Sequence, residues 1–132
     1  MKIKMRWMHD IPNGATIQEF ARMEMRVTEP NGCGVYVDNV TIPLCDTSGY
    51  KLIMHIALGK DGYRMSTRYE NNTGGGGSLP SAKGKRYKTK KDAFEAGIKD
   101  LMEREYLKQF NGSLNRALST FHSASYVQLT LF

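Results

Sequence analysis

Runs of apolar residues separated by turn residues predict the extended segments of this chain. Residues 50–58 form a largely apolar run, turn residues follow at 59–62, and residues 63–70 carry a second run. Two such runs around a glycine-containing turn predict an antiparallel hairpin. Residues 3–7 alternate apolar and basic side chains, which predicts a half-buried strand.

The strongest helical pattern follows Thr89, a good N-cap residue with Asp92 in the first turn. Apolar side chains then recur at helical spacing, which predicts one long helix that ends at the pair 111–112. A second, shorter helix is expected from Ser113. The apolar positions that carry the two predictions are Phe94, Ile98, Leu101, Met102, Tyr106, Leu114, Ala117, Leu118 and Phe121.

The remaining segments carry mixed signals. Thr16 and Glu19 have the spacing of a capping box and predict a short helical turn, while the alternation over residues 21–28 predicts a strand directly after it. Residues 35–37 read as extended, and the stretch around Pro43 as a loop. Residues 71–78 contain four consecutive glycines, which predict a flexible loop.

These elements define an α+β protein with a small antiparallel sheet, packed by one long C-terminal helix and a shorter second helix. At 132 residues the chain is the size of one domain. We expect a single domain over residues 1–122 and a tail over residues 123–132.

The positive charge is concentrated in one segment. The formal net charge is +6, and residues 83–91 contain six basic side chains and no acid. Without those six, 13 basic residues remain against 13 acidic ones, so the rest of the chain is neutral. A polyanion would therefore meet one basic segment rather than a generally basic surface.

Residues 88–93, Lys-Thr-Lys-Lys-Asp-Ala, follow the hairpin and open the long helix. This order, over residues 62–106, resembles the small three-stranded arm-binding domains at the N-termini of phage integrases, although the glycine-rich stretch departs from that compact pattern. The hypothesis is a sheet face, opposite the helix, that presents cations to DNA phosphates. The alternative is a solvated loop. The predicted nucleic-acid-binding residues are Arg64, Arg68, Lys83, Lys85, Arg86, Lys88, Lys90 and Lys91.

The last five residues, Gln-Leu-Thr-Leu-Phe, place large apolar side chains at the chain end. They resemble the peptide by which bacterial polymerases, repair proteins and some phage proteins bind the replication sliding clamp. That resemblance implies that Gln128, Leu129, Leu131 and Phe132 contact the clamp. The alternative is a structural strand, because residues 126–132 also alternate.

No residue pattern indicates catalysis, a cofactor or a metal. Cys33 and Cys45 lack the doublet spacing of a zinc site and are expected to be free thiols. His9, His55 and His122 are far apart in sequence, with no recognisable nucleophile motif beside them. Without an apolar signal segment or a run of roughly 18 apolar residues, the chain is expected to be cytoplasmic and not to enter a membrane.

Together these patterns predict a small protein, not an enzyme, that touches DNA. The resemblance of the terminal pentapeptide implies that it belongs to a bacterium or its mobile elements and docks on the sliding clamp. Its role would be that of an accessory factor or an inhibitor. The rival hypothesis is a nucleic-acid-binding module whose C-terminus is a structural strand. A third hypothesis is a small enzyme, which would require the histidines to converge with acids or with the two cysteines in one pocket.

Overall fold

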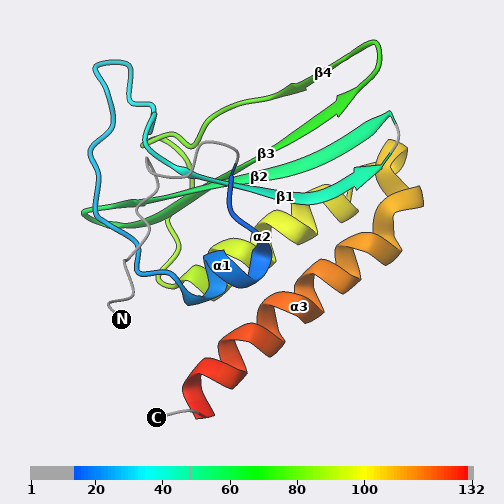
Figure 1. Cartoon of the computed structure of the whole chain (residues 1–132). Coiled ribbons are helices and arrows are strands. Elements are labelled where there is room, and N and C mark those ends of the chain that lie inside the picture. The colour runs from blue at the N-terminus through cyan, green and yellow to red at the C-terminus, as the bar shows by residue number, and fades with distance from the viewer. Residues whose placement is uncertain (1–13, 48, 131–132) are drawn as a thin grey trace.

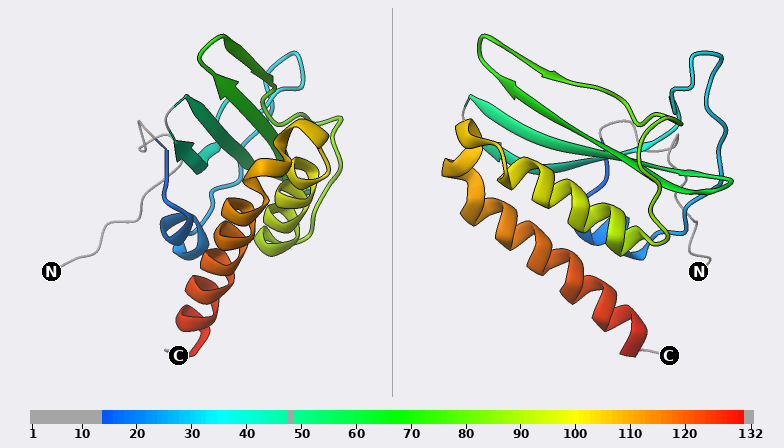
Figure 2. Two further views of the ribbon diagram at one scale, coloured as in Figure 1. Left: turned by 90° about the vertical axis from the view of Figure 1, so that its right-hand side faces the viewer. Right: turned by 180° about the vertical axis from the view of Figure 1, so that it is seen from behind.

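The structure is a computed structural model, and it describes residues 14–47 and 49–130, with side chains to residue 125. A four-stranded antiparallel sheet forms one layer, and three α-helices lie together on one of its faces (Figures 1 and 2). The predicted α+β class, with a longer C-terminal helix and a shorter one against a small antiparallel sheet, is confirmed. The strand expected at residues 3–7 lies outside the described residues.

The centre of the sheet is the predicted hairpin. Strand β2, Tyr50–Gly59, pairs along its whole length with β3, Gly62–Asn71, and the turn between them holds only two residues. Gly62 adopts a φ of +132°, which is disfavoured for residues with a side chain. A Cβ there would also lie 2.9 Å from the carbonyl oxygen of Tyr87, so the turn and the segment that follows the sheet meet at a glycine.

The two outer strands correct the expectation of loops. Strand β1, Val40–Thr47, pairs with β2, and its register shifts between Pro43 and Cys45. An outer strand tolerates proline because it needs to donate hydrogen bonds on one side only, and a bulge relaxes that requirement further.

Strand β4, Gly74–Gly77, consists entirely of glycine and pairs with the end of β3. The expected flexible loop is wrong here. A Cβ on Gly75 would lie 2.1 Å from the carbonyl oxygen of Tyr69, and one on Gly77 would lie 2.7 Å from that of Thr67. The glycines therefore allow two backbones to approach more closely than strands with side chains do.

Helix α1, Ile17–Arg22, begins with the predicted capping box between Thr16 and Glu19. The strand predicted directly after it is wrong. Residues 23–27 are irregular, Met25 is buried, and only Val27 forms an isolated bridge, to Leu58. A single buried side chain in this stretch thus does not make a strand, because no partner strand completes a ladder with it.

Helix α2, Lys90–Met102, has Thr89 as its N-cap, as predicted, but it ends nine residues before Asn111. Arg104 has an extended backbone, with φ −81° and ψ 122°, and its guanidinium group donates to Asp100 and Thr67. A 3₁₀ helix, η2, Glu105–Phe110, then buries Leu107 and Phe110. The break in the helix at Arg104 is favoured because a straight continuation of α2 would carry Leu107 and Phe110 away from the core.

Helix α3, Asn111–Thr130, is the longer helix, so the order of lengths is the reverse of the one expected. Asn111 and Gly112 begin it rather than end its predecessor, and Ser113 lies inside it. The start of the expected tail, from residue 123, also belongs to α3, and Ala124 there is buried. The boundary proposed after residue 122 therefore falls within a continuous helix, and the division into domain and tail stays a prediction.

Three aromatic rings hold the helical layer together. Phe121 of α3 stacks on Phe94 of α2 at 4.5 Å between ring centroids, and Phe20 of α1 lies 5.8 Å from Phe121. Met54 of β2 packs against Gly97, where a Cβ would lie 2.4 Å from its terminal methyl group. Close packing of α2 on the sheet places the start of α2, and the basic segment before it, beside the β2–β3 turn (Figure 1).

Candidate nucleic-acid interface

The basic segment, residues 83–91, leads from the sheet to α2, and the middle of the segment is attached to the sheet. Tyr87 exchanges two backbone hydrogen bonds with Tyr63, at 2.8 and 2.9 Å. Before the segment, the amide of Ala82 donates to the carbonyl of Gly34 at 2.8 Å. At its other end the segment enters α2 at Lys90. The segment is therefore held at both ends and at Tyr87.

Four lysines of the segment are exposed to solvent, namely Lys83, Lys85, Lys88 and Lys91. Within the part of the chain that the structure describes, no carboxylate forms an ion pair with any of the four. The ammonium of Lys85 lies 5.6 Å from the centre of the Tyr87 ring. Solvated ammonium groups without acidic partners remain available to phosphate oxygens, where they can displace condensed counterions.

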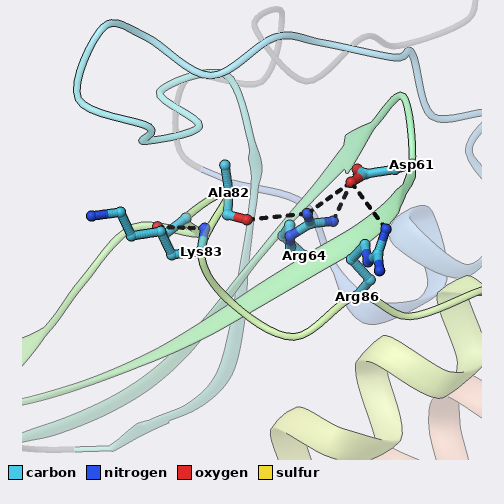
Figure 3. A network of polar contacts seen from close by, with 6 residues as sticks. Asp61, Arg64, Ala82, Lys83 and Arg86 are labelled. Atoms are coloured by element: carbon cyan, nitrogen blue, oxygen red, sulfur yellow. Dashed lines mark hydrogen bonds and ion pairs between the residues drawn. The ribbon is translucent and has the colours of Figure 1, made fainter.

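Arg86 belongs to the same segment but contacts a carboxylate (Figure 3). Asp61, in the β2–β3 turn, lies 3.6 Å from Nη1 of Arg86 and accepts hydrogen bonds from both Nη atoms of Arg64 at 3.2 Å. The hydrogen bonds from Arg64, helped by the charges of Arg64 and Arg86, lower the pKa of Asp61 below its ordinary value. The Asp61 carboxylate thus joins two arginines from different segments.

Arg64 and Arg68 lie on the sheet face away from α2, as the alternation of β3 requires. The face is not free around Arg64, however, because the side chain is only 4% exposed and donates to the carbonyl of Ala82 at 3.2 Å. Tyr36 also covers this face, at Gly59, where a Cβ would meet its hydroxyl oxygen at 2.3 Å. Arg64 therefore contributes to the fold and does not join the exposed lysines.

Arg68 lies farther along β3 and is partly exposed. It forms an ion pair with Glu70 at 3.4 Å, beside a hollow that is lined by Asn71, Asn72 and the glycines of β4. The acid compensates much of its charge locally. The structure therefore separates Arg68 from the basic segment, at the other end of the sheet face.

Lys90 turns inward, unlike its neighbours. Its ammonium donates to the carbonyl of Phe20 at 2.8 Å and to that of Met23, and it lies 5.1 Å above the Phe20 ring. These carbonyls end α1, where the helix dipole favours a cation. Burial lowers the pKa of Lys90 from its ordinary 10.5 to about 8. Lys90 thus connects α1 to α2 and does not face a ligand.

The C-terminal residues are described only in part. The backbone is helical through Thr130, so the alternative of a strand is wrong for residues 126–130. The side chains of Gln128 and Leu129 are not described, and Leu131 and Phe132 lie outside the described residues. Their assignment to a clamp site stays a prediction.

The histidines that the structure describes lie in separate environments. His55, on β2, shares hydrogen bonds with Thr41 and Asn39 at 3.1 and 3.0 Å, and burial lowers its pKa, helped by the charge of Arg68. His122, on α3, contacts Glu95 of α2 at 2.8 Å. His9 lies outside the described residues.

The described side chains form no cluster of histidine, cysteine or acid that could hold a metal ion. Cys33 and Cys45 are free thiols, one exposed and one buried. No constellation for catalysis is visible among these groups.

Asp61 is the residue of this region that the sequence did not single out. Its spacing of three from Arg64 across a hairpin turn was the available signal, whereas Arg86 is remote in sequence.

Comparisons with protein-family models, curated proteins and solved structures found no match. Among the helices that the structure describes, none is both long and apolar enough to span a membrane.

Proposed function

We propose that this chain is a small bacterial or mobile-element protein of the cytoplasm that contacts the phosphate backbone of DNA through its basic segment. The observation that carries the proposal is the exposure of Lys83, Lys85, Lys88 and Lys91 without acidic partners in the described part of the chain, on a segment that is anchored to the sheet.

The anchoring supports the proposal for an entropic reason. A free lysine-rich loop loses backbone freedom when it binds, and that loss opposes binding. A segment already held at Tyr87 and at the start of α2 loses less. Its lysines can therefore displace condensed counterions from DNA at a smaller entropic cost.

The test is a titration of labelled duplex DNA by fluorescence anisotropy at several salt concentrations. We expect the affinity to fall steeply with salt, and the slope to decrease by up to about 3.6 when Lys83, Lys85, Lys88 and Lys91 are all changed to glutamine, because each lost phosphate contact removes about 0.9.

A matched control changes four other exposed cations to glutamine, namely Arg22, Lys99, Lys108 and Arg116. The net charge falls by the same amount, and we expect most of the binding to remain. Equal losses in the two variants would mean that total charge matters and the basic segment does not.

A second proposal concerns the C-terminal pentapeptide, and what favours it is the resemblance of Gln-Leu-Thr-Leu-Phe to the sliding-clamp peptide, from which only the threonine departs. A few apolar anchors can supply most of the binding energy of a short peptide. Docking in an extended form would require the last turn of α3 to unwind. Simultaneous clamp and DNA contacts would reinforce each other through effective concentration.

Deletion of Leu131 and Phe132 tests this proposal against a purified bacterial clamp. We expect the deletion to abolish clamp binding and to leave the melting temperature unchanged, since a docking end is not part of the core. Undiminished clamp binding, or an unfolded truncated protein, would reject the clamp hypothesis. Added salt should weaken the DNA contact and spare the apolar clamp contact.

A further inference from the structure

The β2–β3 turn brings the carboxylate of Asp61 beside Arg86 of the basic segment. Asp61 receives two hydrogen bonds from Arg64, whose side chain is 4% exposed, so a buried residue of β3 holds the carboxylate in position (Figure 3). Its own side chain is 48% exposed, and the carboxylate therefore also faces solvent.

Arg86 is bound differently from Arg64. Its side chain is 64% exposed and its Nη1 lies 3.6 Å from Asp61, beyond ordinary hydrogen-bond distance. An exposed ion pair of this kind contributes little to stability, and a doubly hydrogen-bonded phosphate would be a stronger partner for a guanidinium group. Arg86 can therefore change partners, while Arg64 cannot.

We propose that Asp61 is an internal competitor of DNA phosphate for Arg86, so that the β2–β3 turn limits how tightly the basic segment binds. This inference rests on the proposed DNA contact. In the free protein Arg86 pairs with Asp61, and on DNA a phosphate oxygen takes the place of that carboxylate. Binding therefore costs the ion pair between Asp61 and Arg86, which weakens the complex and keeps it reversible.

The experiment compares the DNA affinities of the whole protein, of Asp61→Asn, of Arg86→Gln and of the double variant, on the same labelled duplex. The amide introduced by Asp61→Asn retains an oxygen that can accept from Arg64, and it removes the negative charge. We expect Asp61→Asn to tighten binding by about twofold to fivefold, the range of a surface ion pair, and to leave the salt slope unchanged, because Arg86 contacts a phosphate in both proteins.

The double-mutant cycle separates a specific competitor from a general charge effect. If Asp61 acts through Arg86, Asp61→Asn will not change the affinity or the salt slope in the Arg86→Gln protein. An equal gain in both backgrounds would mean that any lost acid has the same effect, and it would overturn the inference. So would an unchanged affinity of Asp61→Asn in the native background.

Asp61→Asn removes the charged partner of Arg64 and can destabilise the fold there. Thermal melts therefore accompany each titration. Should Asp61→Asn unfold, the variant Asp61→Asn with Arg64→Met removes both charges together, which is commonly tolerated in buried positions. The same tightening is expected there. The failure of the DNA proposal looks different: the unmodified protein would then show no binding that depends on salt and on the four exposed lysines.

Discussion

Lys88 and Lys90 are two residues apart in the same basic segment, and the structure gives them opposite environments. Lys88 is exposed, whereas Lys90 lies under the end of α1 with its ammonium on two backbone carbonyls. Arg64 and Arg86 differ in the same way, although both contact Asp61. The cations in and around the basic segment therefore divide into two sets. Buried cations hold the fold together, and exposed cations can be reached by a ligand.

The comparison makes stability and DNA affinity separable. Substitution of a buried cation should lower the free energy of unfolding, and substitution of an exposed one should change only DNA binding. The reason is that a buried charge depends on its internal partners, while an exposed charge is hydrated with or without the fold.

The largest effect is expected at Arg64. Arg64→Ala should lower the free energy of unfolding by about 3 kcal/mol, because it removes the packing of a side chain that is almost fully buried and leaves the carbonyl of Ala82 without its donor. Urea denaturation measures this loss. Lys88→Ala is the control and should change the free energy by less than about 0.5 kcal/mol. Similar values for both would erase the distinction between the two sets.

A smaller loss of stability is expected at Lys90. Lys90→Met keeps the apolar stem and removes the ammonium, so the carbonyls of Phe20 and Met23 lose a charged donor. We expect a decrease of about 1.5 kcal/mol in the free energy of unfolding, because the two carbonyls at the end of α1 lose their hydrogen-bond donor. In Lys90→Met, hydrogen exchange should become faster than in the native protein, and the increase should be larger in α1 than in α3. An equal increase in both helices would contradict a local role.

The pH dependence sharpens the assignment of Lys90. Its pKa is lowered to about 8 in the folded protein, from an ordinary 10.5, so the native state loses this proton before the unfolded state does. The unfolding free energy of the native protein minus that of Lys90→Met should therefore rise as pH increases from about 8 to about 10.5. A flat difference between the two titrations would show that the ammonium is not desolvated.

The smallest effect is expected from one exposed lysine. Lys88→Gln should leave the melting temperature unchanged and lower the salt slope of DNA binding by about 0.9, the share of one phosphate contact. The matched change Lys99→Gln, on the exposed side of α2, should leave the slope as it is. A slope that responds equally to both substitutions would remove Lys88 from the interface.

Local signals made the central hairpin, the capping box at Thr16 and the cap at Thr89 predictable, because turn and cap residues act within a few positions. The outer strands were not predictable in this way. Pro43 and the four glycines read as loops, and pairing with β2 and β3 turned both stretches into strands. A strand depends on its neighbour, so its own residues describe only part of it.

For the candidate interface, the sequence determined the position of the basic segment, its excess charge and the start of the helix that follows. Only the tertiary structure decided which cations are available, because burial depends on residues far away along the chain. Lys90 contacts carbonyls at the end of α1, which lie 67 and 70 positions earlier in the chain. Arg86 contacts Asp61, which lies in the β2–β3 turn. Charge is a property of a residue, and its accessibility is a property of the packing around it.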